Sequence, residues 1–425
     1  AQVWAPAENL RTSRIRPDPA MLRLCALGAL GLAAGRCTHA TCEDDAEVLL
    51  QAHAAVNRSF TGRLKDREKP DGYSFEDFMA DFGKHYKGSE LEKRKSLFEA
   101  AVAQVKQHNA QGLGYNLGIN EFADWTADEL TNLRGYKKTG KSPKAMTHSS
   151  GADKPVLLPP SFDWRDKGMV SPVKNQGHCG SCWAFAATST MESHAAIASK
   201  VMTELSTQQL VSCVENPRAC GGTGGCDGAT AELAFEYLVD HPQTFEDVVS
   251  YQNFFGGKVA CSDTIESHAS RYPVVSITGF VKLPVNEYEA LMEALVTKGP
   301  ISVSVDASGW SPYSSGVADF CPTDENVDID HAVVLVAYGG DGDNKYWTIK
   351  NSWGPTWGEK GYIRLKRHDD EGKHCGWDKT PSHGSLCADE EDKPEWVCGT
   401  CGVLFDTSHP VGSKVIGASE GDVDR

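Results

Sequence analysis

Residues 175–185 read Asn-Gln-Gly-His-Cys-Gly-Ser-Cys-Trp-Ala-Phe, and the apolar spacing from Ser181 to about Ser199 predicts a helix with Ser181 as its N-cap. Cys182 then lies at the start of this helix, where unpaired backbone N–H groups and the helix dipole favour a thiolate over a thiol. The thiolate is the nucleophilic form of cysteine, and a neighbouring imidazolium completes its activation. The stretch therefore indicates a catalytic cysteine.

Two later segments carry residues that could work with this cysteine. Asp330-His331-Ala332 opens an apolar stretch and could supply the imidazole, and Asn351, within Lys350-Asn351-Ser352-Trp353, could orient that ring. Each residue alone is weak evidence, because cysteines are more often packed or disulfide-bonded and histidines are more often hydrogen-bonded in a core. The prediction depends on their combination.

A second chemistry fits part of the same stretch. Cys179 and Cys182 form a C-x-x-C pair at a helix start, as in a thiol–disulfide oxidoreductase. Thioredoxin-like pairs usually follow a strand and a tryptophan inside a βαβ unit. Here Trp183 comes after the pair and no strand is predicted before it, so this activity stays only as an alternative.

Helical and strand-like patterns divide the rest of the chain. Helical spacing covers 75–86, resumes over 90–109 and returns at 205–213 and 229–239. Strands are predicted over 274–280, 301–307, 332–339, 345–353 and 361–367, separated by Gly, Pro and Asp. Helices first and strands second predict an α+β fold of two packed lobes, with the site between them.

Composition and charge limit the class of protein. Of the 425 residues, 40% are hydrophobic and 24% are charged, which excludes a disordered or fibrous chain. The net charge of −16 argues against a nucleic-acid partner. Residues 1–157 carry 22 basic and 20 acidic side chains, whereas residues 158–425 carry 20 and 38, so the acidity belongs to the second part. The length and this asymmetry predict two or three folded units.

Cysteine usage and the N-terminal pattern indicate the secretory pathway. The 14 cysteines are too many for a reducing cytosol. Met21-Leu22-Arg23 precedes the 11-residue apolar run Leu24–Ala34, too short for a membrane span of about 20 residues but suited to a signal peptide over 21–40. Residues 1–20 are then upstream leader, and residues 41–70 are irregular, with a glycosylation sequon at Asn57.

Taken together, the motifs resemble those of the papain family of cysteine peptidases. Residues 175–185 resemble its nucleophile segment, and Asp330-His331-Ala332-Val333 and Asn351-Ser352-Trp353-Gly354 resemble its other two signatures, in the same order. The resemblance covers about Leu158–Val411. It implies a papain-like two-lobed fold, with a helical lobe and a β-barrel-like lobe.

The resemblance extends upstream to the inhibitory prosegment of a cathepsin L-like zymogen. Two interspersed motifs carry it: Glu90, Arg94, Phe98 and Asn109 fit a helical prosegment motif, and Gly118, Asn120, Phe122 and Asp124 fit a G-x-N-x-F-x-D motif. A mainly helical prosegment that acts as an intramolecular inhibitor is implied.

The resemblance also implies catalytic roles. Cys182 attacks the peptide carbonyl to form a thioester, and His331 exchanges the proton. Asn351 holds the imidazole and Trp353 shields that hydrogen bond. The Gln176 side-chain amide and the Cys182 backbone N–H form the oxyanion hole. No cofactor and no metal are implied, and no loop that would block the cleft of an exopeptidase is evident, so an endopeptidase is predicted. A catalytically inactive homologue that acts by binding is the other alternative.

Substrate-binding residues follow from the same resemblance. The loop that contains Gly228 and Ala229 resembles the segment that pairs with extended substrate, although the family often has Gly at the position of Ala229. Asp406 falls at the base of the second specificity pocket. A carboxylate there could pair with Arg or Lys, so basic residues are expected two positions before the cut, as well as Phe or Leu. The alternative is an Asp406 side chain turned to solvent.

For the cysteines, the resemblance implies three disulfides: Cys179–Cys226, Cys213–Cys261 and Cys321–Cys401. Cys220, Cys375, Cys387 and Cys398 are left without an assignment, and the last three lie in an acidic insertion over about 368–398. Cys398-Gly-Thr-Cys401 could suggest zinc, but the matched second pair of a structural site is missing. Extra disulfides are therefore expected to hold the insertion.

The expected organisation is a prodomain over 71–136, an activation linker over 137–157 cut between Asp153 and Pro160, and a peptidase domain over 158–425. We expect a monomer in a lysosome- or vacuole-like compartment or outside the cell. Its partners would be peptide and protein substrates and its own prosegment, with no nucleic acid. Protonation of prosegment carboxylates such as Asp124 would release the inhibitor at acid pH.

Overall fold

The structure is a computed structural model that describes residues 68, 70–135, 145–147, 157–218, 222–384, 387 and 391–416. All of these belong to one compact unit, Asp66–Arg425. The expected signal peptide over 21–40, the sequon at Asn57, Cys220 and most of the linker over 137–157 lie outside the described residues. None of the helices described is long and apolar enough to cross a membrane.

The first part of the described chain is mainly helical. It contains α3 (Phe75–Asp81), α4 (Ser89–Asn109), β1 (Tyr115–Leu117) and α5 (Ala127–Asn132). Capping boxes begin two of these helices, Ser74 with Asp77 for α3 and Thr126 with Glu129 for α5. α3 is shorter than the helical spacing suggested, because Gly83 adopts a left-handed φ of 61° just after the helix.

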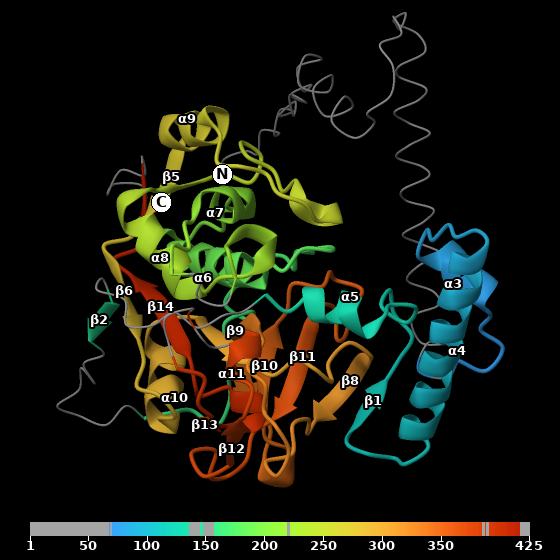
Figure 1. Cartoon of the computed structure of the whole chain (residues 1–425). Coiled ribbons are helices and arrows are strands. Elements are labelled where there is room, and N and C mark those ends of the chain that lie inside the picture. The colour runs from blue at the N-terminus through green and yellow to red at the C-terminus, as the bar shows by residue number, and fades with distance from the viewer. Residues whose placement is uncertain are drawn as a thin grey trace, which may run out of the picture. The chain divides into compact units, whose positions relative to one another are not determined.

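An aromatic core joins α3 to α4, which lie together at one side of the molecule (Figure 1). The ring of Phe98 lies 5.5 Å from that of Phe75 and 5.0 Å from that of Phe78. All three side chains are buried. Phe98 of the prosegment motif is therefore part of the core that folds this segment.

The helical lobe is built around α6 (Cys182–Ser199). Every residue from Cys182 to Ala196 is buried, because the helix packs against the strand His331–Gly339 and the helix Ala231–Asp240. The remaining elements of this lobe are α7 (Thr207–Cys213), η2 (Gly225–Asp227), α8 (Ala231–Asp240), β4 (Gln243–Thr244), η3 (Asn253–Phe255), α9 (Asp263–Arg271), β5 (Pro273–Ser276) and β15 (Lys414–Val415).

The second lobe is a ten-stranded sheet with the order β1-β8-β11-β10-β9-β7-β14-β6-β2, and β3 pairs with β9 off this path. Its other strands are β2 (Ala145–Thr147), β3 (Phe162–Asp163), β6 (Gly279–Lys282), β7 (Ile301–Val305), β8 (Tyr313–Ala318), β9 (His331–Gly339), β10 (Tyr346–Lys350), β11 (Tyr362–Lys366) and β14 (Thr407–Val411), and α10 (Tyr288–Thr297) and η4 (Gly342–Asn344) complete the lobe. β9 is buried along its whole length and contacts α6, so one strand joins the lobes (Figure 1). The expected α+β, two-lobed fold is confirmed.

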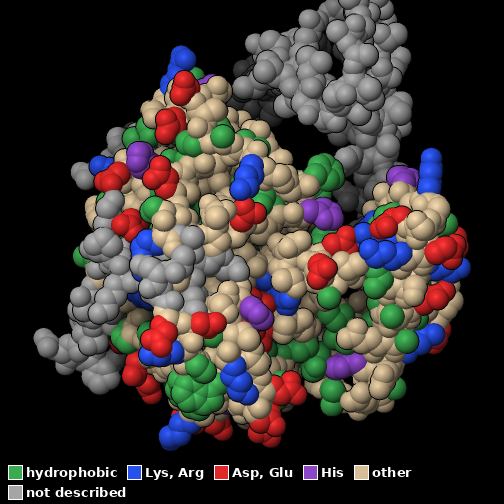
Figure 2. All heavy atoms as spheres, in the orientation of Figure 1, with side chains coloured by type: hydrophobic (Ala, Val, Ile, Leu, Met, Phe, Trp, Pro, Cys, Tyr) green, Lys and Arg blue, Asp and Glu red, His purple; other side chains and the backbone are tan. Residues whose placement is uncertain are grey.

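The acidic insertion forms a small separate sheet of β12 (Cys375–Asp378) and β13 (Glu395–Cys398), with α11 (Pro381–Gly384) between them and η5 (Thr400–Gly402) after them. A disulfide joins Cys375 to Cys398 at one end of this pair. Trp377 and Trp396 face each other across the two strands and are each 46% exposed. Acidic side chains line the lower edge of the molecule in Figure 2, where Figure 1 places this hairpin.

The disulfides exclude two interpretations of the C-x-x-C pairs, a redox disulfide at 179–182 and a zinc site at 398–401. The structure joins Cys179 to Cys226, Cys213 to Cys261 and Cys321 to Cys401, and Cys387 is disulfide-bonded as well. Cys182 is free, so the C-x-x-C at 179–182 is not a redox disulfide. Cys398 and Cys401 belong to two different disulfides and have no thiolate for zinc.

Candidate active site

Cys182 is the first residue of α6, as predicted, and its side chain is fully buried. The backbone N–H of Gly135, from the N-terminal segment, donates to its Sγ over 3.2 Å. Ser181 occupies the N-cap position but does not cap the helix with its side chain; its hydroxyl lies 2.8 Å from that of Tyr251 instead. The cap function expected of Ser181 is therefore wrong, because the hydroxyl is used to hold the loop.

His331 and Asn351 are brought together by the sheet. His331 is the first residue of β9 and Asn351 follows β10, the neighbouring strand. The Nε2 atom of His331 lies 2.8 Å from the Oδ1 atom of Asn351, and its Nδ1 atom is buried without a hydrogen-bond partner. The ring of Trp353 covers the imidazole at a centroid distance of 4.9 Å.

Burial changes the acidity of both reactive groups. It raises the pKa of the Cys182 thiol to about 11, against the opposing effect of backbone N–H donors, and it lowers the pKa of His331 to about 4. With the N-terminal segment in place, the pair therefore favours neutral thiol and neutral imidazole at pH 7.

The side-chain amide of Gln176 points at the N-terminal segment and at the loop before Cys182. Its Nε2 donates to the carbonyl of Leu133 over 2.8 Å and to that of Cys179 over 2.7 Å, while its Oε1 accepts from Ser352 over 2.6 Å. The amide that was expected in an oxyanion hole thus holds a carbonyl of the N-terminal segment.

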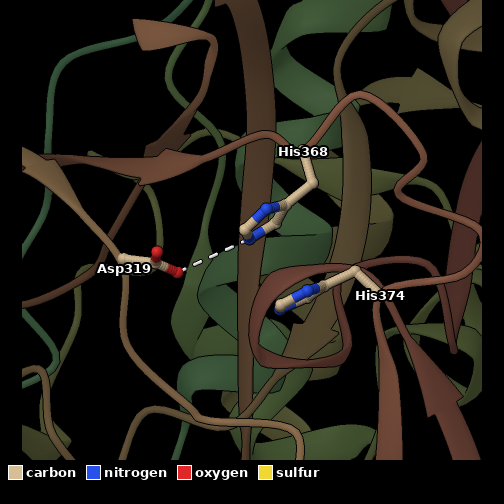
Figure 3. A group of neighbouring side chains, drawn as sticks. All are labelled: Asp319, His368 and His374. Atoms are coloured by element: carbon tan, nitrogen blue, oxygen red, sulfur yellow. Dashed lines mark ion pairs between the residues drawn. The ribbon is translucent and has the colours of Figure 1, made fainter. Parts of the chain in front are cut away.

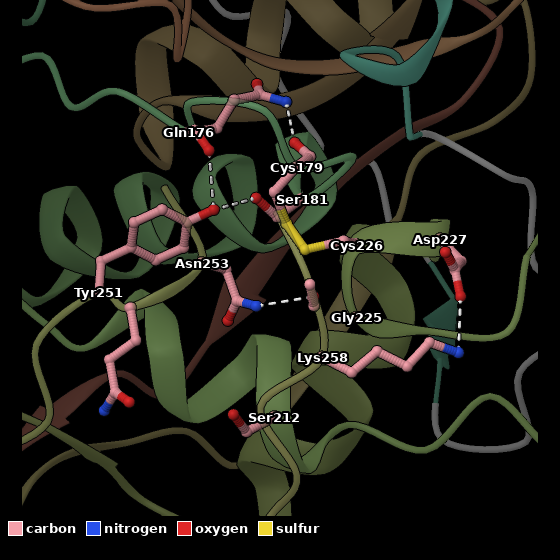
Figure 4. Close-up of a disulfide and its surroundings, with 12 residues drawn as sticks. Gln176, Cys179, Ser181, Ser212, Gly225, Cys226, Asp227, Tyr251, Asn253 and Lys258 are labelled. Atoms are coloured by element: carbon pink, nitrogen blue, oxygen red, sulfur yellow. Dashed lines mark hydrogen bonds and ion pairs between the residues drawn. A yellow bond between two sulfur atoms is a disulfide. The ribbon is translucent and has the colours of Figure 1, made fainter. Parts of the chain in front are cut away.

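Figure 4 shows how the loop before Cys182 is fixed. The hydroxyl of Tyr251 lies between the carbonyl of Gln176, to which it donates over 2.9 Å, and the Ser181 hydroxyl. The Cys179–Cys226 disulfide ties this loop to η2, whose Asp227 pairs with Lys258 at 2.9 Å. A covalent bond and two hydroxyl contacts therefore fix the backbone around the nucleophile.

Residues 133–135 pass directly through the site. After Leu133, the guanidinium of Arg134 lies 3.1 Å from a carboxylate oxygen of Asp330, and the carbonyl of Gly135 accepts from the N–H of Ala229 over 3.1 Å. A Cβ atom on Gly135 would lie 1.9 Å from the carbonyl oxygen of Gly180, so only glycine fits. These three residues were not predicted from the sequence, because they follow both prosegment motifs.

The prosegment motif residues lie in two groups. Arg94 binds Glu129 through two bonds of 2.6 Å, and it also binds Glu90 and the carbonyl of Asp124. The carboxylate of Asp124, which is fully buried, accepts from Lys84 and Tyr86. This group holds α4 to the start of α5.

The second group connects the segment to the sheet lobe. The Asn120 amide donates to the carbonyl of Ser311 over 2.6 Å, and the N–H of Gly118 donates to the carbonyl of Pro312 over 2.8 Å. The ring of Phe122 packs edge-on to that of Trp353 at a centroid distance of 5.5 Å. Asn109 closes the end of α4 on Leu117 through 2.9 Å bonds.

Two features of this region were not predicted. The ring of Trp125 stacks on that of His178 at a centroid distance of 4.4 Å. A cavity of about 340 Å³ lies beside Trp125, and residues of α4 and of 308–312 are part of its lining.

Asp406 has a partner that the sequence did not predict. It is buried rather than turned to solvent, and it forms an ion pair with Lys282 of β6. The buried Glu232 lies close enough that its pKa is raised, by burial first and by the charge of Asp406 second. The carboxylate is therefore already neutralised by a lysine, which weakens the expected attraction for a basic substrate side chain.

Two family models match the chain. Residues 158–385 match the "Papain family cysteine protease" model and residues 75–130 match the "Cathepsin propeptide inhibitor domain (I29)" model. The chain therefore belongs to the papain family of cysteine proteases, and the segment that crosses its site follows a propeptide inhibitor domain.

Curated relatives support the same family assignment. Procathepsin L of Mus musculus is 36% identical over 307 residues, which cover 68% of this chain and 85% of that protein. Cathepsin S of Bos taurus is 35% identical, covering 72% and 90%. The oryzain beta chain of Oryza sativa subsp. japonica is 38% identical over 66% of this chain, which spans 58% of that longer protein.

Solved structures of precursors match as well. The digestive procathepsin L2 proteinase from Tenebrio molitor larval midgut has a TM-score of 0.64 at 30% identity, covering 79% of this chain and 98% of that one. The recombinant stem bromelain precursor has a TM-score of 0.62 at 32% identity, covering 79% and 97%. The similarity to precursor structures covers both the N-terminal segment and the two lobes.

Proposed function

We propose that this chain is the precursor of an endopeptidase in which Cys182 attacks the peptide carbonyl and His331 exchanges the proton. Asn351 accepts the proton of Nε2, so Nδ1 is the ring atom left to take the proton of the thiol. The thioester forms as the amine leaves with that proton, and water then releases the acid. The observation that carries the proposal is the His331–Asn351 bond of 2.8 Å in the same site as a free, helix-terminal Cys182.

The oxyanion hole is proposed to consist of the Gln176 amide and the Cys182 N–H. Its support is the bond from Gln176 to the carbonyl of Leu133, since a group that holds one carbonyl can hold the oxygen of a scissile carbonyl. Trp353 keeps water from the His331–Asn351 bond, as its ring lies over the imidazole.

The prosegment is proposed to inhibit by lying in the site in the wrong direction. For a substrate we propose the opposite order, in which the residue paired with Ala229 precedes the residue whose carbonyl enters the oxyanion hole. Here Gly135 pairs with Ala229 and follows Leu133, whose carbonyl is held by Gln176. The segment occupies the site, yet no carbonyl lies in the order needed for cleavage.

The test is hydrolysis of a Phe-Arg fluorogenic peptide under reducing, acidic conditions, with and without an epoxide inhibitor that alkylates activated thiolates. Activity should appear as the prosegment is lost, and it should vanish with one inhibitor adduct, located on Cys182 by mass spectrometry. An inactive chain after complete prosegment removal would favour the binding homologue instead.

Acid activation is proposed to involve His178. Packing against Trp125 partly desolvates the His178 ring and so lowers its pKa, although the residue is exposed overall. The charges of Lys84 and Arg94 lower this pKa as well, while those of Glu129 and Asp124 raise it. The neutral ring is thus favoured with the prosegment bound, and a released His178 has a pKa near about 6.5. Below that pH, proton uptake favours release, so the contact stabilises the zymogen above about pH 6.5 and less as the pH falls.

We therefore expect the zymogen to process faster at pH 5 than at pH 7, and His178→Gln to reduce the ratio of the two rates several-fold, within the roughly tenfold allowed per pKa unit. Processing is followed by gel densitometry, with the exposed prosegment residue His85→Gln as the matched control. An unchanged ratio in His178→Gln would assign the pH dependence to other groups.

The second specificity pocket is proposed to be controlled by Lys282 together with Asp406. Because the Lys282 ammonium pairs with the carboxylate, the wild-type enzyme should prefer Phe-Arg over Arg-Arg substrates. Lys282→Met leaves Asp406 available, and we expect the Arg-Arg to Phe-Arg ratio of kcat/KM to rise by about tenfold, or ~1.4 kcal/mol.

The matched control is Lys258→Met, which removes a lysine paired with Asp227 at an exposed position. The double variant Lys282→Met with Asp406→Asn should lose the gain. Equal ratios in Lys282→Met and wild type would show that this carboxylate does not reach the substrate.

The wider organisation is proposed from the sequence. The prodomain spans 71–136, the linker 137–157 and the peptidase 158–425, and the precursor enters the secretory pathway through residues 21–40. A monomer in a lysosome- or vacuole-like compartment, or secreted, fits the disulfides of both lobes.

A further inference from the structure

Three side chains of types that bind metal ions, Asp319, His368 and His374, meet at the start of the acidic insertion (Figure 3). Asp319 follows β8, His368 follows β11 and His374 precedes β12. Asp319 precedes His368 by 49 residues, whereas His368 and His374 are six residues apart. In Figure 3 the carboxylate of Asp319 points to the ring of His368, and the ring of His374 lies beside it.

The distances are close to those of a metal centre. One donor atom from each residue lies within 4.8 Å of the others, and the Nε2 atom of His368 lies 3.5 Å from the Oδ1 atom of Asp319. Zn–N bonds of about 2.0–2.1 Å and Zn–O bonds of about 2.0–2.2 Å separate tetrahedral donors by roughly 3.3–3.5 Å. The two imidazole rings are stacked at 3.7 Å and 17°, so one ring must turn about its Cβ–Cγ bond for both to reach one ion.

Each imidazole has one buried ring nitrogen that makes no hydrogen bond. The Nε2 atoms of His368 and His374 are both inaccessible to solvent and lack hydrogen-bond partners. At 3.5 Å, the contact of His368 with Asp319 is too long for a good hydrogen bond. Burying unpaired nitrogen atoms costs free energy, and a bound ion would remove that cost at both rings.

The surrounding charges allow a cation. Lys366 pairs with the other oxygen of Asp319 at 3.1 Å, and its side chain is 33% exposed, so it can turn to solvent when an ion arrives. Asp319 itself is 44% exposed, which leaves room for a water as a fourth ligand. Two imidazoles and one carboxylate suit zinc, copper or nickel better than calcium or magnesium.

We propose that Asp319, His368 and His374 bind one divalent transition-metal ion of the zinc class. The ion joins the insertion, which supplies both histidines, to the loop after β8. The next residue, Phe320, packs against Tyr115 of the prosegment at 4.8 Å, so the site also lies beside the contact between β1 and β8. The proposal does not depend on the catalytic assignment.

Binding is measured by titration calorimetry with ZnCl₂ on the full-length Cys182→Ala chain, which cannot cleave itself and lacks the reactive thiol. One ion should bind per chain and raise the melting temperature, and Co²⁺ should give the visible absorption of a low-symmetry site with nitrogen ligands. Ca²⁺ and Mg²⁺ should do neither.

In that background, His368→Gln and His374→Gln should each weaken Zn²⁺ binding by roughly 100-fold or more, because loss of even an outer partner costs about 10–100-fold. Asp319→Asn should weaken it less. His383→Gln is the matched control, since this exposed histidine of the insertion pairs with Asp328 instead. Melting temperatures without metal show that the variants are folded.

Zn²⁺ affinity equal in His368→Gln, His374→Gln and the His383→Gln control would place the ion elsewhere and overturn the proposal. So would the absence of any heat and any shift in melting temperature, which would leave Asp319 and His368 as an ion pair only.

Discussion

Cys182→Ala is expected to lower kcat/KM for a Phe-Arg peptide by roughly 10⁵–10⁶-fold, the size of effect seen when a covalent nucleophile is removed. The fold should be kept, because alanine deletes only the sulfur atom and leaves the α6 backbone and the Cys179–Cys226 disulfide in place. The bond from the Gly135 N–H to the sulfur atom is lost with that atom.

The measurement uses chains whose prosegment has been removed by an added protease, because Cys182→Ala should remain full-length by itself. Wild type treated in the same way is the control, and circular dichroism verifies folding. Turnover of the variant within a few-fold of wild type would remove Cys182 from the mechanism.

Gly135→Ala is expected to release the site while the prosegment is still attached. The added Cβ atom would lie 1.9 Å from the carbonyl oxygen of Gly180 and 2.4 Å from its carbon, both backbone atoms of the nucleophile loop that cannot move aside. Overpacking of this kind costs about 1–3 kcal/mol, so access to Cys182 in the intact zymogen should rise roughly 10–100-fold.

Access is measured as the rate at which the epoxide labels Cys182 at pH 7, before any processing. Gly112→Ala is the matched control: this prosegment glycine has open space around it, although its φ of 65° adds about 1–2 kcal/mol of local strain. Equal labelling of the two variants would mean that residues 133–135 do not control latency.

Patterns within single segments were enough to predict helices, strands and Cys182 as the candidate nucleophile. The apolar spacing after Ser181 predicted α6, and the start of this helix placed Cys182 where backbone N–H groups point. Runs of β-branched and aromatic residues separated by Gly, Pro and Asp predicted β9, β10 and β11. The motifs for His331 and Asn351 are short, and the resemblance identified both.

Ends and caps were less predictable. α3 stops at Asp81 because of the conformation of Gly83, although the helical spacing continues beyond it. Ser181 is at the N-cap position, but its hydroxyl contacts Tyr251, a residue of another segment. Such competition between local and distant partners is invisible in a single stretch of sequence.

The sequence by itself determined the helix and strand order and the resemblance to a papain-family precursor, and it made Cys182 the predicted nucleophile, because each depends on spacing within one segment or on a motif. Only the tertiary structure decided that Lys282 neutralises Asp406, that residues 133–135 lie in the site, and that Asp319 lies beside His368 and His374. These contacts join segments distant along the chain, and they exist only after the sheet register has brought the segments together.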